Sequence, residues 1–272
     1  MPQITDRQAL MRNRRRAEPD ALFLQEQAAN ELQERLIEVN RTFKSVAIVT
    51  GFPDFWADRY PDATIIPDDE TLTLQPQIHD AVLHTMCLHW ANDPVGQLVQ
   101  SRHALKPDGL LLCTFLGGQP LHELRSTLAE AEARVTGGLS PRIAPMGEIR
   151  DLGGLLQRAG FALPVADSTP LTASYANAFH LMHDLRKMGE NNALNDRIKH
   201  ATRREILIKA SQIYAANYRN EDNRVDATFE IITLTGWAPS DTQQQPLRPG
   251  SAKARLADAL GAIETPLDRS KD

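Results

Sequence analysis

The chain has 272 residues, a hydrophobic share of 42% and a formal net charge of −5, which suits one large domain or two small ones. This charge gives no reason to expect nucleic-acid binding, and no apolar run approaches the roughly 18 residues of a membrane-spanning helix. Residues 1–20 are rich in arginine but lack a following apolar segment, which argues against a secretory signal, and their acidic residues argue against an organelle transit peptide. Two cysteines lie inside apolar runs and no Cys/His cluster has metal-ligand spacing, so we expect a cytoplasmic protein without a metal site.

The first half of the chain predicts alternating helices and short apolar strands. Apolar residues at helical spacing follow Glu18, and a β-branched run follows Phe43. Later segments switch between the two patterns, with proline and glycine at the boundaries. In chain order the pattern predicts a helix over 18–39, a strand over 45–50, a helix over 53–61, strands over 63–70 and within 78–90, a helix over 92–109 and a strand over 110–117.

The second half adds helices and two further strand regions. The pattern predicts helices over 120–138 and 146–161, a strand pair or one bent strand over 163–175, two helices within 177–217 and a long strand over 225–239. Alternation of this kind predicts a parallel, doubly wound α/β sheet. We expect a single domain over 1–272, with an N-terminal helical segment at 1–42, a helical insertion at 177–217 and a polar tail at 240–272.

Two candidate sites follow the first two predicted strands. Gly51 comes directly after the first strand, but a cofactor cradle needs several glycines so that backbone N–H groups can approach the ligand. An ordinary strand-to-helix turn is the alternative. Asp68, Asp69 and Glu70 follow the second strand, where open α/β sheets bind ligands and an acid can hold a ribose. Here the alternative is a solvated strand end.

Two further candidates lie downstream. Leu88, His89 and Trp90 follow the third strand, where they form either a pocket wall or an aromatic cluster beside a helix cap. No partner completes a catalytic triad with His89, so no catalytic residue is assigned. The tail carries Arg248, Lys253 and Arg255, which form either a patch for an anionic partner or a solvated surface.

Long motifs between residues 18 and 260 resemble one protein family. The segment LHWANDPVGQLVQSRHALKPDGLLLCTFLGG, at 88–118, resembles the central part of class I S-adenosylmethionine-dependent methyltransferases. More narrowly, the chain resembles the branch that holds the biotin-pathway carrier-protein methyltransferases and the mitochondrial complex I assembly-factor methyltransferases. The assembly-factor side fits better, on GGLSPRIAPMGEIRDLGGLLQRAGFALPVADS, LMHDLRKMGENNAL, TFEIITLTGWAP and QQPLRPGSAKARLADAL. The resemblance implies a methyltransferase-like sheet with an antiparallel last strand.

The region around Gly51 departs from the family pattern. Family members usually have an acidic strand end followed by an Asp-x-Gly-x-Gly-x-Gly loop, whereas here Ile48 or Val49 takes the acid position and Gly51 matches the last glycine alone. We therefore expect one missing βα unit, with two strands between Gly51 and Trp90 where the family has three. Phe55 or Trp56 is expected to fill the cofactor cleft.

The functional expectation follows from the family resemblance together with the divergent loop around Gly51. We expect a non-methylating binding or assembly factor with a protein partner, in the context of respiratory complex I, and no bound cofactor. The alternative is an active S-adenosylmethionine-dependent methyltransferase with a divergent loop, lined by Gly51, Asp69, Leu88 and His89. Enzyme activity is thus left open, and a small-molecule carrier is a third possibility. The branch also implies hydroxylation of a partner arginine, for which the sequence offers no iron-ligand constellation.

Overall fold

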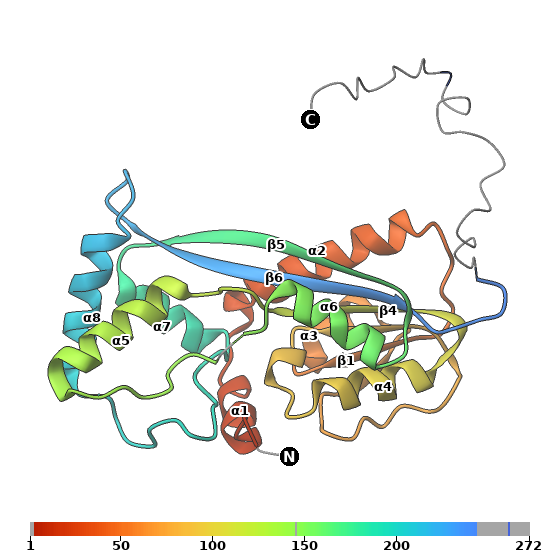
Figure 1. The fold of residues 1–272 in the computed structure, drawn as a ribbon, viewed down its shortest axis with the longest axis horizontal. Coiled ribbons are helices and arrows are strands. Elements are labelled where there is room, and N and C mark those ends of the chain that lie inside the picture. Colours follow the sequence, from red (N-terminus) through yellow and green to blue (C-terminus); the bar gives the residue numbers. More distant parts are fainter. Residues whose placement is uncertain (1–2, 145, 244–260, 262–272) are drawn as a thin grey trace, which may run out of the picture. The chain divides into compact units, whose positions relative to one another are not determined.

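The computed structural model describes residues 3–144, 146–243 and 261, in two units, 1–240 and 241–272. In the second unit only residues 241–243 and 261 are described, so the tail cations Arg248, Lys253 and Arg255 lie outside the described residues. The helices of the first unit, shown in Figure 1, are α1 (Arg7–Arg14), α2 (Phe23–Glu38), α3 (Pro53–Arg59), α4 (Pro94–Ala104), α5 (His122–Thr136), α6 (Ile149–Arg158), α7 (Ala178–Lys187) and α8 (Arg204–Asn217), with short 3₁₀ turns η1 (Pro19–Ala21) and η2 (Leu88–Trp90).

The first unit is built on one mixed sheet. Its strands are β1 (Val46–Thr50), β2 (Thr64–Pro67), β3 (His79–Thr85), β4 (Leu105–Leu116), β5 (Ala162–Tyr175) and β6 (Val225–Trp237), in the order β2-β1-β3-β4-β6-β5. The pairs among β2, β1, β3 and β4 are parallel, and β6 is antiparallel to both of its neighbours. The predicted α/β fold, its mostly parallel sheet and its antiparallel last strand are therefore confirmed.

Side chains alternate between the two faces of the sheet because successive residues of a strand point to opposite sides. On β1, Ala47 and Val49 belong to a buried cluster that includes Leu98 of α4 and Leu156 of α6. Ile48, on the opposite face, packs with residues of α2 and α3. The two helix layers exclude water from both faces, which explains why the central strands read as unbroken apolar runs.

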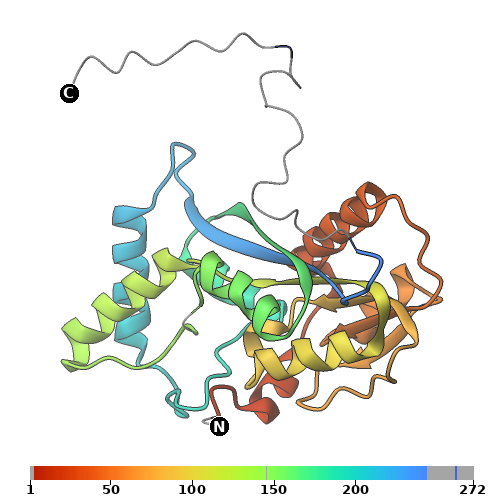
Figure 2. The same ribbon diagram turned by 45° about the vertical axis from the view of Figure 1, so that its right-hand side comes forward.

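The strands β5 and β6 are long and extend past the parallel part of the sheet. Their far halves pack against α5, α7 and α8, which gather at that end of the first unit (Figure 1). Figure 2 shows the same helices after a 45° turn, still grouped on the extended end of β6. The helices α7 and α8 lie between β5 and β6 in the chain, so the expected helical insertion is present.

One predicted helix end was wrong, for a local reason, whereas the two separate helices and the single-strand alternative predicted in the second half of the chain are present. The helix expected to end near Gly109 ends at Ala104, because Leu105 already pairs with His79 and the following residues begin β4. The segment 188–203 contains no helix, so the two helices of the insertion are separated. The region 163–175, where a strand pair was the alternative, belongs to one strand.

The strand count near Gly51 agrees with the expectation. Between Gly51 and Trp90, a stretch described throughout, the chain forms β2 and β3. Within the described ranges, no helix has both the length and the apolar character that crossing a membrane requires.

Candidate functional site

Three loops meet at the carboxyl edge of the parallel strands. In the parallel register, Thr50 of β1 lies opposite Pro67 of β2 and Thr85 of β3. The residues that follow these ends, Gly51, Asp68 and the η2 turn, therefore lie at the same edge of the sheet, where open α/β folds bind ligands. This edge is the candidate functional site.

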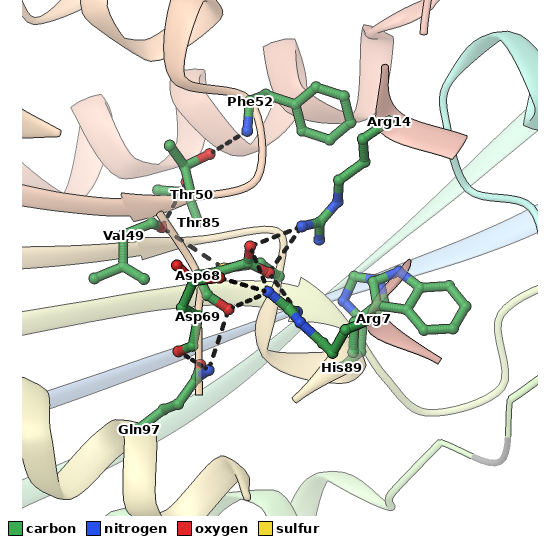
Figure 3. Close-up of polar contacts among 12 residues, drawn as sticks. Arg7, Arg14, Val49, Thr50, Phe52, Asp68, Asp69, Thr85, His89 and Gln97 are labelled. Atoms are coloured by element: carbon green, nitrogen blue, oxygen red, sulfur yellow. Dashed lines mark hydrogen bonds and ion pairs between the residues drawn. The ribbon is translucent and has the colours of Figure 1, made fainter. Parts of the chain in front are cut away.

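Asp68 is a buried carboxylate that binds two arginines from α1. Its side chain is 6% exposed, and Arg14 Nη1 donates to both of its oxygens at 2.8 Å. Arg7 donates to the same two oxygens at 3.3 Å and to the backbone oxygen of Asp68 at 2.7 Å. Figure 3 shows both guanidinium groups directed at Asp68. The N-terminal helix is thereby fixed to the end of β2.

The guanidinium group of Arg14 also lies against the turn after β1. A Cβ atom added to Gly51 would lie 2.2 Å from Cζ and Nη1 of Arg14, so any larger residue here would force this guanidinium to shift. The guanidinium carbon lies 5.7 Å from the centre of the Phe52 ring, at cation–π distance. The space directly above the turn is thus filled by a side chain of the same protein.

The electrostatics of this pair follow from burial and mutual charge. Burial alone raises the pKa of Asp68, but the charges and hydrogen bonds of Arg14 and Arg7 outweigh it and hold that pKa below its usual value. Within the described part of the chain, Nε and Nη2 of Arg14 are buried without a hydrogen-bond partner. The carboxylate is therefore well satisfied, whereas the arginine is only partly so.

A second cluster of polar side chains joins the η2 turn to Glu190. His89 Nε2 is 3.3 Å from Glu190 Oε2, and Trp90 Nε1 donates to the same oxygen at 2.8 Å. Burial raises the pKa of Glu190, but the hydrogen bond and charge of His89 and the charge of Arg14 lower it overall. These residues line one end of a cavity of about 290 Å³, whose other walls are mainly apolar, with side chains of α5 and α7 together with Ile143, Ala144 and Met146.

Buried polar residues beneath the edge hold the Asp68 loop in place. Gln97 of α4 donates to the backbone oxygen of Asp69 at 3.1 Å, and its side-chain oxygen lies 2.8 Å from His84 Nε2. Burial lowers the pKa of His84 to about 4, so this histidine is neutral near pH 7 and donates from Nε2 to Gln97. The loop after β2 is thus supported from below by α4.

The structure places the four predicted cofactor-lining residues in different environments. Gly51 lies under Arg14, and Leu88 is buried in the apolar core. Asp69 has a side chain that is 64% exposed and lies 3.6 Å from Arg7, while His89 faces Glu190. The structure therefore brings Gly51 and the Asp68–Asp69 loop together through α1.

The two residues expected to fill the cofactor cleft, Phe55 and Trp56, lie elsewhere. Trp56 is fully buried, but in the core beside α2, where its Nε1 donates to Gln25 at 3.1 Å, and Phe55 packs against it. The side chain over Gly51 is Arg14, which the sequence patterns did not single out. The sequence signal for this helix is the arginine-rich segment 7–16. Among the described residues, no group of three His, Cys, Asp or Glu side chains is arranged to hold a metal ion.

Comparisons with known proteins agree with this architecture. No family model matches the chain. The chain is 38% identical to the human protein "Arginine-hydroxylase NDUFAF5, mitochondrial" over 203 residues, which cover 75% of this chain and 58% of that protein. It is 34% identical to the malonyl-[acyl-carrier protein] O-methyltransferase of Xylella fastidiosa, over 66% of this chain and 59% of that one. RP459 of Rickettsia prowazekii, whose name assigns it to the methyltransferases, is 32% identical, over 59% of this chain and 71% of its own length.

Among solved structures, the methyltransferase-type protein BH2331 of Bacillus halodurans superposes with a TM-score of 0.48 at 14% identity, covering 76% of this chain and 98% of that one. Sheet order, antiparallel β6 and the edge loops define a class I methyltransferase-type fold. The chain belongs to the S-adenosylmethionine-dependent methyltransferase superfamily, in the branch that contains the NDUFAF5 proteins and the carrier-protein O-methyltransferases.

The comparisons also correct the predicted location and limit what can be inferred about activity. The predicted cytoplasmic location is wrong by this comparison, because the NDUFAF5 relatives are mitochondrial proteins. The chain spans between 44% and 61% of the length of the NDUFAF5 proteins it matches, so their activity is not transferred to it as a whole.

The residues at the edge of the sheet do not fit S-adenosylmethionine in the arrangement described. The methionine end of such a cofactor needs the space above the glycine turn, and Arg14 occupies it. A ribose diol needs a carboxylate with free acceptor positions, and both oxygens of Asp68 already accept hydrogen bonds from α1.

Proposed function

We propose that this protein is a methyltransferase-fold binding or assembly factor that does not transfer methyl groups. One observation carries the proposal: the Arg14 guanidinium lies over Gly51 while binding Asp68. Methyl transfer depends mainly on positioning the cofactor against its acceptor, and this pair occupies the position that the cofactor needs. The two-strand interval between Gly51 and Trp90 supports the same conclusion, because the family has three strands there.

The proposed setting is the maturation of respiratory complex I. It rests on the similarity to NDUFAF5 proteins, which extends over about three quarters of this chain. In this setting the protein recognises a protein partner, and the cavity beside His89, Trp90 and Glu190 is available for a partner side chain. A pull-down with subunits of the respiratory complex tests this part of the proposal.

Calorimetry with S-adenosylmethionine and S-adenosylhomocysteine tests the absence of methyl transfer. Loss of charge-assisted hydrogen bonds worth roughly 1.5–3 kcal/mol each weakens binding by orders of magnitude, since about 1.4 kcal/mol is tenfold. We expect no dissociation constant below about 100 µM. Loss of these hydrogen bonds would weaken a micromolar ligand to about this range or beyond. The folded state is checked in the same sample by circular dichroism. A tighter complex would overturn the proposal.

An active S-adenosylmethionine-dependent methyltransferase is the second candidate. Similarity to carrier-protein O-methyltransferases favours it, as does the polar end of the cavity beside the η2 turn. In that case α1 must leave the edge of the sheet before Gly51, Asp69, Leu88 and His89 can line a cofactor. The same calorimetric titration separates the two candidates, because only this one predicts measurable binding.

A further inference from the structure

We propose that the cavity beside the η2 turn is a binding site for a small, uncharged aliphatic molecule with one hydroxyl group, which lies at the end formed by His89, Trp90 and Glu190. This ligand lies outside the proposed function because it is not part of a protein, and it would compete with a partner side chain for the same space. The size of the cavity, its walls and one unpaired atom of His89 define the chemistry of the ligand.

The cavity is large enough for a ligand of moderate size. Its volume is about 290 Å³. An apolar cavity of about 150 Å³ in another protein stays dry and binds benzene, a ring of six carbon atoms. By proportion, the cavity here has room for roughly ten to twelve non-hydrogen atoms. An aliphatic chain of about eight to ten carbon atoms with a single polar head group fits this size.

Aliphatic side chains form most of the cavity wall. Leu124 comes from α5, Met182 from α7 and Leu207 from α8. Among the lining residues that the structure describes, aromatic rings occur only in His89 and Trp90, at the polar end. The other walls therefore offer no aromatic face on which a flat ligand could stack, whereas methionine side chains adapt to a flexible one. These walls favour a flexible aliphatic chain over an aromatic ligand.

The charged side chains of the lining are already engaged. Arg142 donates from Nε and Nη2 to the carboxylate of Glu132 at 3.1 and 2.7 Å, and from Nη1 to Thr202 at 2.9 Å. At the other end, Oε2 of Glu190 accepts from Trp90 at 2.8 Å. A ligand without net charge leaves both arrangements intact.

His89 has a buried ring nitrogen without a partner. Its side chain is 1% exposed, and its Nε2 atom lies 3.3 Å from Glu190 Oε2. Within the described part of the chain, Nδ1 of His89 makes no hydrogen bond, and no other side-chain atom of the cavity lining is both buried and unpaired. Leaving a buried polar atom unpaired is unfavourable. A ligand that bonds to Nδ1 therefore gains free energy that the protein alone does not have.

A hydroxyl group suits this nitrogen better than a charged head group. Because Nε2 of His89 faces a carboxylate, Nε2 carries a proton, and Nδ1 accepts a hydrogen bond in the neutral ring or donates one in the charged ring. A hydroxyl group can do either, whereas an ammonium only donates and an ionised carboxylate only accepts. An ammonium also brings three donors, which this single acceptor cannot satisfy. A carboxylate is disfavoured further by the negative charge of Glu190 beside His89.

Calorimetry of the full chain tests the proposal with ligands that share one chain length and differ in head group. The probe is n-octanol, and the matched controls are octanoic acid, octylamine and octyl fluoride, whose fluorine is a very weak hydrogen-bond acceptor. We expect n-octanol to bind at least tenfold more tightly than each control. The shorter n-hexanol should bind roughly 15-fold more weakly than n-octanol, because each buried CH₂ group contributes about fourfold. Equal binding of n-octanol and octyl fluoride, or no binding of n-octanol, overturns the proposal.

Two variants test the location of the ligand. Ala144→Leu adds volume to the cavity wall and should weaken binding of every ligand at least tenfold, whereas Leu163→Ala, at an exposed position of β5, is the control and should change none. His89→Gln keeps an amide nitrogen near the position of Nε2 but removes Nδ1. It should abolish the preference for n-octanol over octyl fluoride. Unchanged binding of n-octanol to Ala144→Leu would show that the ligand binds elsewhere and overturns the proposal.

A measurement on the native chain keeps the test decisive if His89→Gln folds poorly. In protein labelled with a nitrogen isotope at its histidines, n-octanol should shift the nuclear magnetic resonance signal of His89 Nδ1, because the hydroxyl bonds to that atom. Binding without this shift contradicts the proposed hydrogen bond. The pull-down and the S-adenosylmethionine titration test the proposed function and involve no alcohol, so the two failures are distinguishable.

Discussion

Asp68 is the residue whose charge holds the N-terminal helix against the sheet. It comes from the loop after β2, whereas its partners Arg7 and Arg14 lie 61 and 54 positions earlier in the chain. Because the carboxylate and Arg14 are both buried, the loss of Asp68 leaves Arg14 as an uncompensated charge in the interior, and the loss of Arg14 leaves Asp68 paired with Arg7 alone. The neighbouring Asp69 provides a natural comparison, because its side chain is largely exposed.

Replacing Asp68 should therefore destabilise the protein far more than replacing Asp69. We expect Asp68→Asn to lower the free energy of unfolding by about 3–5 kcal/mol, as is typical when one partner of a buried ion pair is removed. Asp69→Asn should cost less than about 1 kcal/mol because exposed pairs contribute little. Urea denaturation of both variants measures the difference, and similar costs would contradict the geometry described for Asp68.

Gly51 and Arg14 should behave as one unit. Gly51→Ala places a methyl group on the guanidinium of Arg14 and should cost about 1–3 kcal/mol, as overpacking in a core does. Gly154→Ala, in α6, is the control: nothing lies within 4 Å of the added atom, and the change should stabilise the helix by about 0.5–1 kcal/mol. Chemical denaturation measures both. A neutral Gly51→Ala would show that Arg14 does not rest on the turn.

His84 should make stability depend on pH in the mildly acidic range. Its folded pKa is lowered to about 4 from an ordinary 6.5, because burial disfavours the charged ring. As pH falls below 6.5 the unfolded chain takes up a proton that the folded chain does not, so stability falls by about 3 kcal/mol down to pH 4.

The free energies of unfolding of the native chain and of His84→Gln, measured at pH 7 and pH 5, isolate this effect. The native chain should lose more stability between the two values than the variant does. Asp68 and Glu190, whose folded pKa values are lowered, lose their contributions only as the pH falls further. Equal losses in the two proteins would assign the acid sensitivity to other groups.

At the scale of elements, strands were easier to predict than the helix that closes the site. The runs that form β1 and β4 are apolar because both faces of the sheet are covered, so the local sequence alone predicts that these strands are buried. The helix α1 has no such local signal: its segment RQALMRNR is mostly polar, and it is held by ion pairs to residues more than 50 positions away. The hydrophobic periodicity of a segment does not indicate ion pairs with residues that are distant in the sequence.

The same reasoning explains which site residues the sequence could indicate. Strand ends bring Gly51 and the acids at 68–70 to one edge, which topology alone predicts. That Asp68 is buried and Asp69 exposed depends on where α1 and α4 pack. Glu190 was missed because it follows α7, in a non-helical segment that the pattern assigned to no site.

At the scale of the whole first unit, β6 joins three buried clusters. Phe229 and Ile231 pack with α5, α7 and α8, whereas Ile232 and Leu234 pack with α4 and α6. Trp237 reaches the cluster that contains Trp56. Because one strand contributes to all three of these clusters, residues 3–240 should unfold as a single cooperative body.

Phe229→Ala tests this cooperativity. Truncating a fully buried aromatic side chain should cost about 3–5 kcal/mol. The unfolding midpoint seen by tryptophan fluorescence, which reports Trp56 of α3, Trp90 of η2 and Trp237 at the end of β6, should shift together with the midpoint seen by far-ultraviolet circular dichroism. Leu163→Ala, at a position that is 53% exposed, is the control and should leave both nearly unchanged. Separate midpoints would show two independently folding parts.

The pairing of Arg14 with Asp68 also makes the present arrangement difficult to reverse by single substitutions. Removing Arg14 leaves the buried carboxylate with the longer contacts of Arg7 alone, removing Asp68 leaves a buried guanidinium unpaired, and adding a side chain at Gly51 forces Arg14 to shift. Each first step toward an open edge therefore passes through a less stable protein. In evolution, the need for a stable fold therefore retains the pair of Arg14 and Asp68, even where selection on catalytic activity is absent.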